Sequence, residues 1–193
     1  TSLNGKRIFI TQAETFMGPT LCEVFTELGA EVITDTQILT DPTLPEQIIQ
    51  AAGHIDVLVA NLAVPAPFTK GQLVNDDEWS ATFNALVDPL PRLCTAVLPQ
   101  MIERQSGKIL VMGSASALRG IKRASTYSAA RGAQLAYVQA MGVEMAPQGI
   151  QVNAIAQNFV DNPTYFPEET KANLAFQAVS YTHLRAHETS LHL

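Results

Sequence analysis

Short runs of β-branched and aliphatic residues alternate along this chain with longer amphipathic stretches, and this alternation constrains the fold more than any other feature. Strand-length runs that alternate with helical stretches predict βαβ units, whose right-handed crossovers build a parallel sheet covered by helices on both faces. The sequence therefore predicts an α/β fold with a doubly wound parallel sheet, in which one further strand is harder to locate than the rest. The clear strands are Arg7–Thr11, Glu31–Thr34, Asp56–Ala60, Lys108–Gly113 and Gln151–Ile155.

The amphipathic stretches predict helices between these strands. The expected helices are Gly18–Leu28, Pro45–Ala52, Asp76–Glu103 and Ser125–Ala146. Pro89 and Pro91 fall inside the third stretch, and because proline removes an amide donor and clashes with the preceding turn, we expect two helices there. Two loops rich in proline and polar residues, Pro65–Gly71 and Gln157–Pro167, follow strand carboxyl ends, where open α/β sheets bind their ligands. These loops are expected to line the functional site.

Composition restricts the class of protein further. A chain of 193 residues with 47% apolar content fits one domain with a real hydrophobic core. Its 18 acidic and 12 basic residues give a charge of −6 without a Lys/Arg cluster in the sequence, so no nucleic-acid partner is predicted. No apolar stretch approaches the roughly 18 residues of a membrane span, and the N-terminal residues lack a signal-peptide pattern. We expect a cytoplasmic protein without a membrane partner, in which Cys22 and Cys94 are buried free thiols.

The segment 179–193 differs from the rest of the chain. It carries three of the four histidines and does not continue the amphipathic pattern. His183, His187 and Glu188 could share a helix face and suit a metal site. The string, however, resembles translated sequencing-adapter DNA, and such segments are excluded from fold reasoning. We therefore expect one catalytic domain over residues 1–178, a non-native tail over residues 179–193, and no metal site.

Ser114, Tyr127 and Arg131 form the most informative group of polar residues. Ser114 follows a predicted strand, Tyr127 comes thirteen positions later, and Arg131 comes four positions after Tyr127. A spacing of four puts the last two on one helix face, so all three can meet at the ligand-binding edge of the sheet. A tyrosine and an arginine one turn apart are by themselves more often a surface pair. The spacing from the serine and the strand before it favour a catalytic set.

These residues resemble the Ser…Tyr-x-x-x-Lys signature of short-chain dehydrogenases, with arginine in place of lysine. In that family the turn after the first strand reads Thr-Gly-x-x-x-Gly-x-Gly, because glycines permit the tight turn and let backbone amides approach the pyrophosphate. Here Gln12 and Phe16 stand at two of the three glycine positions, with Glu14 between them. The resemblance therefore implies a Rossmann-like fold, and the substitutions predict that neither NAD nor NADP binds. The alternative is a divergent but working cofactor loop, which Asp35 supports because it stands where a ribose-binding acid would lie.

Other positions depart from the dehydrogenase pattern in the same direction. The family's Asn-Asn-Ala-Gly is here Ala60-Asn61-Leu62-Ala63. The helical asparagine that completes the family's proton relay is here Leu86, and the family's Pro-Gly-x-x-x-Thr has become the segment 157–162. The cofactor loops have changed while the serine and tyrosine remain, which argues against simple decay of a dehydrogenase.

This combination is similar to that of the halohydrin dehalogenases, and the resemblance runs from Leu3 to Gln177. It implies catalysis by Ser114, Tyr127 and Arg131 without a cofactor. It also implies a halide site formed by a small set of residues: Phe16, Gln157, Asn158, Phe159 and Val160. The implied partners are a small haloalcohol or epoxide and a halide ion. Members of that family extend beyond this length and form homotetramers, so the resemblance also implies C-terminal truncation.

The resemblance implies a mechanism in which Tyr127 is the base. A phenol ordinarily ionises near pH 10, so a tyrosine that acts as a base at neutral pH needs a neighbouring cation, which Arg131 supplies. Ser114 would hold the substrate oxygen for intramolecular displacement. The alternatives are an NAD(P)-dependent oxidoreductase and a protein without catalytic activity, either a pseudoenzyme or an inactive fragment.

Overall fold

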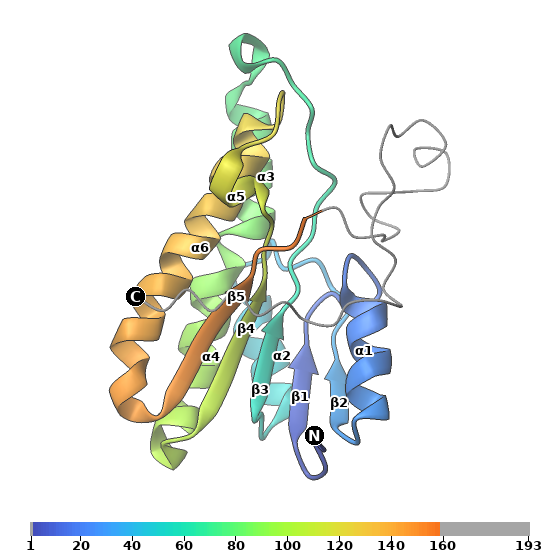
Figure 1. Cartoon of the computed structure of the whole chain (residues 1–193), viewed down its shortest axis with the longest axis vertical. Helices are drawn as coiled ribbons and strands as arrows, with labels where there is room; N and C mark the ends of the chain where they lie inside the picture. The colour runs from blue at the N-terminus through green and yellow to red at the C-terminus, as the bar shows by residue number, and fades with distance from the viewer. Residues whose placement is uncertain (1, 159–193) are drawn as a thin grey trace.

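The computed structural model describes residues 2–158, which form one parallel sheet flanked by helices (Figure 1). The strands are β1 (Arg7–Ile10), β2 (Glu31–Thr34), β3 (Val57–Ala60), β4 (Gly107–Met112) and β5 (Ile150–Ile155). The α-helices are α1 (Gly18–Glu27), α2 (Leu44–Ala52), α3 (Asp76–Leu86), α4 (Pro89–Arg104), α5 (Ser116–Arg119) and α6 (Ser125–Met145). Two short 3-10 helices are η1 (Gly71–Leu73) and η2 (Ala146–Gln148). Each clearly predicted strand is present, and its ends lie within one residue of the prediction.

The sheet confirms the predicted doubly wound α/β fold. Within residues 2–158 its strand order is β2-β1-β3-β4-β5, and every pairing is parallel. The chain moves from β1 to β2 and then crosses to β3 on the other side of β1, so the winding reverses between β1 and β3. Open α/β sheets bind ligands outside the strand carboxyl ends at such a reversal. The further strand that we expected is not among the described residues.

Apolar side chains alternate between the two faces of the strands and create a core on each face. Ile8 and Ile10 of β1 pack with Phe16 and Met17 on the face that α1 covers. Phe9 faces the opposite side and belongs to a larger core that includes buried residues of α2, α4 and α6. The end of the turn after β1 is therefore part of the core, because Phe16 and Met17 are buried within it.

The stretch predicted as an interrupted helix over Asp76–Glu103 is two helices, as its prolines indicated. The side chain of Asn75 accepts a hydrogen bond from the backbone amide of Glu78 at 2.8 Å and caps α3. Helix α4 begins at Pro89, a position at which a missing amide costs no helical hydrogen bond. The single-turn helix α5 was not predicted. Within the described part of the chain, no helix is long and apolar enough to cross a membrane. The predicted boundary between domain and tail, at residues 178 and 179, lies outside this part.

Candidate active site

Ser114, Tyr127 and Arg131 lie at the carboxyl edge of the sheet, on two elements. Ser114 follows β4 after a single glycine, and α6 begins at Ser125, which places Tyr127 in its first turn and Arg131 one turn later. The exposed fraction is 6% for Tyr127 and 1% for Arg131, whereas Ser114 is half-buried. The alternative in which the tyrosine and arginine form a surface pair is therefore wrong.

Hydrogen bonds to Tyr127, Met112 and Gln134 hold the guanidinium group of Arg131. Its Nε donates to Oη of Tyr127 at 3.0 Å, and its Nη1 donates to the backbone carbonyl of Met112 and to Oε1 of Gln134, each at 3.0 Å. The ring centroids of Phe16 and Tyr127 lie 5.2 and 5.1 Å from its Cζ atom. Both distances are within the roughly 6 Å of a cation–π contact. A buried and permanent cation thus touches both the tyrosine hydroxyl and an aromatic ring of the β1–α1 turn.

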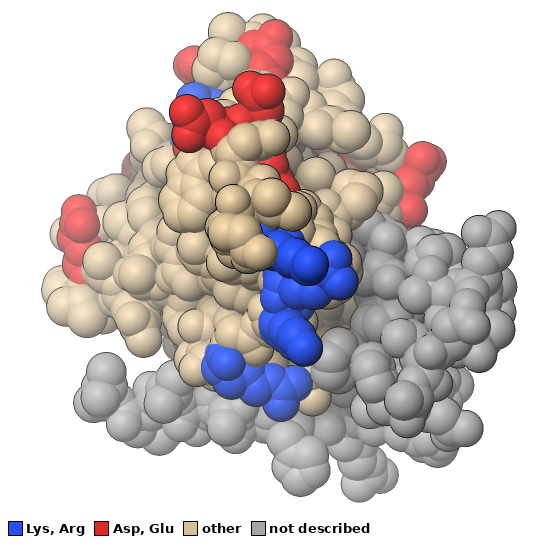
Figure 2. Space-filling model, turned by 90° about the horizontal axis from the view of Figure 1, so that it is seen from above, with Lys and Arg blue, Asp and Glu red and all other residues tan. Residues whose placement is uncertain are grey.

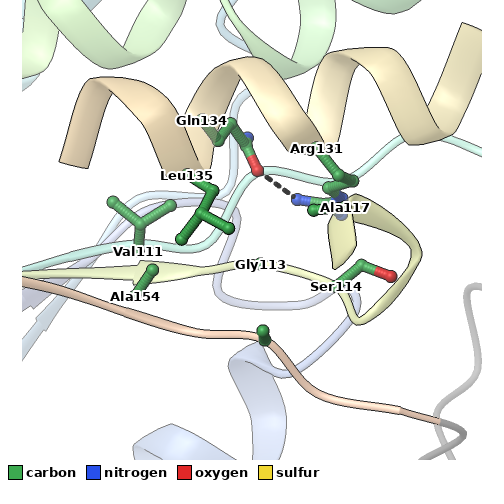
Figure 3. Close-up of a pocket in the computed structure, with 9 residues that line it drawn as sticks. Val111, Gly113, Ser114, Ala117, Arg131, Gln134, Leu135 and Ala154 are labelled. Carbon is green, nitrogen blue, oxygen red and sulfur yellow. Dashed lines mark hydrogen bonds between the residues drawn. The ribbon is translucent and has the colours of Figure 1, made fainter. Parts of the chain in front are cut away.

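A small pocket lies between the carboxyl ends of β4 and β5 and helices α5 and α6 (Figure 3). Ser114 and Arg131 stand at one end, and apolar side chains line the other: Val111, Leu135 and Ala154. Its volume of about 10 Å³ suffices for about one water molecule. Oγ of Ser114 accepts a hydrogen bond from the backbone amide of Ser116 at 3.2 Å. A hydroxyl in that role still carries a proton that it can donate to a ligand oxygen.

The turn between β1 and α1 keeps the backbone path of a glycine-rich turn although two of the glycines are absent. Gln12 and Phe16 have φ angles of 45° and 52°, in the left-handed region that side chains disfavour. Gly18 remains, and a Cβ atom there would lie 2.4 Å from the carbonyl oxygen of Ala13. Gln12 and Phe16 are each 3% exposed, so their side chains fill the inside of the turn. The exposed Glu14 adds a negative charge beside it.

Gln12 and Asn61 bind this turn to the end of β3. Oε1 of Gln12 accepts from the amide of Ala63 at 2.8 Å, and Nε2 donates to the carbonyl of Ala63 at 3.3 Å. Nδ2 of Asn61 donates to the carbonyls of Gln12 and Thr15, each at 3.0 Å, and Oδ1 accepts from the amide of Met17 at 3.3 Å. Met17 immediately precedes α1, where a pyrophosphate would need free backbone amides. Because side chains fill the turn and bond to its backbone, the residues present do not fit a dinucleotide.

Asp35, on which the alternative of a working cofactor loop rests, belongs to a turn. Its carboxylate accepts from the backbone amide of Gln37 at 2.9 Å and from its side-chain amide at 3.0 Å. Its backbone carbonyl accepts from the amide of Ala13 at 2.8 Å. An aspartate that bonds to the backbone two residues later is ordinary turn chemistry. These contacts support a structural role for Asp35.

The loop after β5 was predicted to supply part of the halide site, and its first residues are described. The backbone carbonyl of Gln157, which is half-buried, accepts from the amide of Ala115 at 2.7 Å. Oδ1 of the exposed Asn158 accepts a hydrogen bond from Arg119 of α5. The structure thus brings the start of this loop against the segment that follows β4. The remaining predicted residues lie outside the described part of the chain: Phe159 and Val160.

Gln134 was missed among the predicted site residues. It is 1% exposed, its Oε1 accepts from Arg131, and its Nε2 donates to the backbone carbonyl of Leu86. Leu86 itself is fully buried. The signal that could have found Gln134 is its position three residues after Arg131, because residues at that spacing are neighbours on a helix surface.

Basic side chains gather at this edge of the molecule. Figure 2 looks onto the carboxyl edge of the sheet and shows Lys and Arg side chains in a band that runs from the centre of the face downward, with acidic side chains above it and to both sides. The α5–α6 segment carries three exposed basic residues: Arg119, Lys122 and Arg123. These three lie within five positions of one another in the sequence, so the expectation that the sequence holds no Lys/Arg cluster overlooked a local basic segment in a chain whose net charge is −6. Such a band raises the local concentration of small anions.

Cysteines and metal-binding groups contribute nothing to this site. Both cysteines are free; Cys94 is buried, as predicted, and Cys22 is half-buried. Burial raises the pKa of the Cys94 thiol to about 11 and also raises the pKa of Cys22. Thiols with raised pKa values are protonated at neutral pH and therefore poor nucleophiles. Within residues 2–158 no cluster of His, Cys, Asp and Glu could hold a metal ion. The three histidines of the segment 179–193, which we predict to be non-native, lie outside that range.

Comparison with known proteins places the chain in a family. A family model described as short chain dehydrogenase matches residues 42–173, so the chain belongs to the short-chain dehydrogenase family. The 3-oxoacyl-(acyl-carrier-protein) reductase FabG of Vibrio harveyi is 27% identical and aligns over 83% of this chain and 75% of its own length. The 2-keto-3-deoxy-L-fuconate dehydrogenase of Xanthomonas campestris is 31% identical, over 85% of this chain and 61% of its own length.

Solved structures share the fold. One described as a dehalogenation enzyme has a TM-score of 0.83 and 29% identity, and the match covers 90% of this chain and 80% of that chain. The 3-ketoacyl-(acyl-carrier-protein) reductase of Brucella melitensis, complexed with NADH, has a TM-score of 0.82 at 19% identity and covers 93% and 87% of the two chains. At that identity the likeness to the reductase shows the fold alone. Since one fold hosts different chemistries, the function has to be inferred from the residues of the site.

Proposed function

We propose that this protein is a halohydrin dehalogenase, which converts vicinal haloalcohols to epoxides without a nucleotide cofactor. The observation that carries the proposal is the buried ring of Phe16, which stands at a glycine position of the nucleotide turn and lies 5.2 Å from the guanidinium of Arg131. An aromatic ring therefore fills the space in which a dehydrogenase needs its cofactor, while the tyrosine and the cation beside it keep their hydrogen bond.

The proposed reaction is an intramolecular displacement. The hydroxyl proton of the haloalcohol passes to the phenolate oxygen of Tyr127, and the freed oxygen attacks the neighbouring carbon from behind. A carbon–oxygen bond forms, the carbon–halogen bond breaks, and its electron pair leaves with the halide. The products are an epoxide, a halide ion and a proton, so nothing is oxidised or reduced and no hydride acceptor is needed. In reverse, a small anion opens an epoxide.

Each member of the catalytic set has a defined part in this reaction. Arg131 stays cationic at every relevant pH, and its Nε–H group donates to the oxygen of Tyr127, so a permanent cation lies beside the proposed base. Ser114 donates its hydroxyl proton to the substrate oxygen and so aligns it for attack. The halide leaves against Phe16 and the loop over residues 157–160. The basic band at this edge of the sheet supports the proposal because it favours an anionic product there.

The second candidate function is an NAD(P)-dependent oxidoreductase. It is favoured by the names of the relatives above, which are reductases and dehydrogenases. The filled turn at Gln12 and Phe16 argues against it. The assembly into a homotetramer and the cytoplasmic location stay predictions under either function.

The test is halide release from 1,3-dichloro-2-propanol with no cofactor added. We expect chloride and protons to appear in equal amounts, at a rate that NADH and NADPH leave unchanged. A parallel assay follows the oxidation of NADPH in the presence of a 3-oxoacyl thioester, and we expect no reaction. Chloride release that depends on NAD(P), or reduction of the thioester, would overturn the proposal in favour of the second candidate.

A further inference from the structure

Gln134 lies at the centre of a buried chain of polar contacts that ends at the tyrosine hydroxyl. Its Oε1 accepts from Nη1 of Arg131 at 3.0 Å, and Nε of the same guanidinium donates to Tyr127 at 3.0 Å. On the other side, Nε2 of Gln134 donates to the backbone carbonyl of Leu86, the last residue of α3. Figure 3 shows Gln134 above the pocket with its oxygen directed at Arg131. From this chain of contacts, we propose that Gln134 is a positioning residue that fixes Arg131 for the reaction.

The guanidinium of Arg131 needs a residue that holds it in one orientation, because a guanidinium can present several different N–H groups to the same oxygen. It carries five donors in a rigid planar fork, and its long stem has many rotamers. Here the carbonyl of Met112 and the amide of Gln134 both accept from Nη1, and this pins one edge of the fork. With this edge held, Nε donates to Oη of Tyr127 at 3.0 Å. Loss of the Gln134 acceptor would leave a buried donor with one partner fewer and let the fork rotate.

The other end of Gln134 explains why the amide itself does not move. Its Nε2 is anchored on Leu86, which belongs to α3, and α3 packs against α6. Thr126, the neighbour of Tyr127, donates to the carboxylate of Glu78 at 2.8 Å and joins the same two helices near their N-terminal ends. Two side-chain hydrogen bonds between α3 and α6 thus bracket the Tyr127–Arg131 pair. The position of the cation is set by the packing of these helices.

The chemistry of this chain of contacts separates positioning from proton transfer. An arginine does not lose its proton in proteins, and a carboxamide and a backbone carbonyl do not titrate. The network that runs from Tyr127 to Leu86 therefore holds charge and conducts no proton. The proton that Tyr127 takes from the substrate therefore does not leave through Arg131 and Gln134. This inference rests on the proposed function, because it assigns Tyr127 as the base.

The experiment compares Gln134→Met, Gln134→Glu and a matched control, Gln100→Met. Gln100 has the same kind of contacts far from the site: its Oε1 accepts from Arg104 at 3.0 Å, and its Nε2 donates to the backbone carbonyl of Gly53 at 2.9 Å. Methionine keeps the length of glutamine without its polar atoms. Rates of chloride release are measured across pH, and the ionisation midpoint of Tyr127 is measured without substrate from phenolate absorbance, with Tyr127→Phe as the blank.

We expect Gln134→Met to lower kcat by up to about 10²-fold with little change in KM, because a misplaced Arg131 acts on the reaction and not on substrate binding. Gln134→Glu keeps the acceptor for Arg131 but replaces the donor to Leu86 with an oxygen, and it puts an anion on the guanidinium, which draws its charge away from Tyr127. The acidic limb of the pH–rate profile and the phenolate midpoint should both move upward, because the added anion disfavours a second negative charge nearby. Gln100→Met should move neither quantity, whatever it does to stability.

Several outcomes are informative. If both Gln134 variants lose activity only in proportion to their folded fraction, with unchanged pH limb and phenolate midpoint, Gln134 is structural and the inference is wrong. If Gln134→Met does not fold, the isosteric Gln134→Glu still decides through its pH limb and midpoint. If the unmodified protein releases no halide but the phenolate midpoint responds to Gln134→Glu, the proposed function fails while the positioning of Arg131 stands.

Discussion

The carboxyl ends of β4 and β1 face the same edge of the sheet, yet they have diverged in different ways. After β4, the Ser114–Tyr127–Arg131 set is intact, and its cation and tyrosine are joined at 3.0 Å. After β1, the backbone still follows the path of a nucleotide-binding turn, with left-handed φ angles at Gln12 and Phe16. The side chains there nevertheless occupy the space that the path was shaped to leave open. The fold sets the backbone conformation of the turn, whereas its side chains determine which ligand the turn can bind.

The filled turn is stable because its strain is offset locally. A left-handed φ costs about 1–2 kcal/mol for a residue with a Cβ atom. Burial of a phenylalanine side chain contributes about 1.5–3 kcal/mol in return, and Phe16 is 3% exposed. Gln12 gains two hydrogen bonds to the backbone of Ala63. Strain and compensation thus arise in the same residues.

The largest effect in this comparison is expected at Tyr127. Tyr127→Phe removes the base and should lower the rate of halide release by at least about 10³-fold, because no other group takes its place. Stability should change little, since the ring and its packing remain. The measurement is chloride release, with thermal unfolding as the check on folding. The matched control is Tyr137→Phe on the same helix. Full activity of Tyr127→Phe would show that the β4 end is not catalytic.

Ser114→Ala should have the next largest effect, a loss of about 10²–10³-fold in rate by analogy with removal of an oxyanion-type donor. Ser128→Ala is the matched control, because the hydroxyl of Ser128 is buried and has no hydrogen-bond partner among the described residues. Chloride release under saturating substrate separates the two. Equal rates for both variants would remove Ser114 from the catalytic set and leave Tyr127 and Arg131 alone.

The two regions also differ in how far the sequence could predict them. Tyr127 and Arg131 could be placed together because a spacing of four on a helix fixes their relative position, and the strands followed from short runs of β-branched and aliphatic residues. The pairing of Gln12 with Ala63 could not be predicted, since it joins two strand ends that are fifty-one positions apart in the sequence. The contact between Gln134 and Leu86 depends in the same way on how α3 packs against α6. Residue spacing predicts contacts within one helix or strand, but contacts between elements can be identified only once the fold is known.

A smaller effect, on stability, tests whether the β1 turn keeps the backbone of a glycine-rich turn. Phe16→Ala should lower the free energy of unfolding by about 3 kcal/mol through loss of buried packing. Phe16→Gly should be less destabilising than Phe16→Ala by about 1 kcal/mol, because glycine adopts the observed φ of 52° without strain.

Phe25 supplies the control for this comparison. It lies in α1 and packs against the same core, but helical backbone disfavours glycine. Phe25→Gly should therefore be more destabilising than Phe25→Ala by about 1 kcal/mol, the reverse order. Urea unfolding of the four variants measures both differences. The same order at both positions would mean that the left-handed angle at Phe16 does not govern its stability.

The smallest expected effect is the response of the unmodified protein to NADH, where we expect none. Side chains of Gln12 and Phe16 fill the turn, Asn61 bonds to the amide of Met17 before α1, and the exposed Glu14 repels a pyrophosphate. NADH fluorescence should therefore be the same with and without the protein. The informative partner is Gln12→Gly/Phe16→Gly, which restores the glycine pattern. Unlike the unmodified protein, this double variant should change the fluorescence of NADH. Adding Glu14→Gln should strengthen the signal by removing the negative charge. If the unmodified protein binds NADH as well as the double variant does, the side chains do not close the turn. The β1 end would then bind a nucleotide as the turn of a dehydrogenase does, and an oxidoreductase would become the better account of this protein.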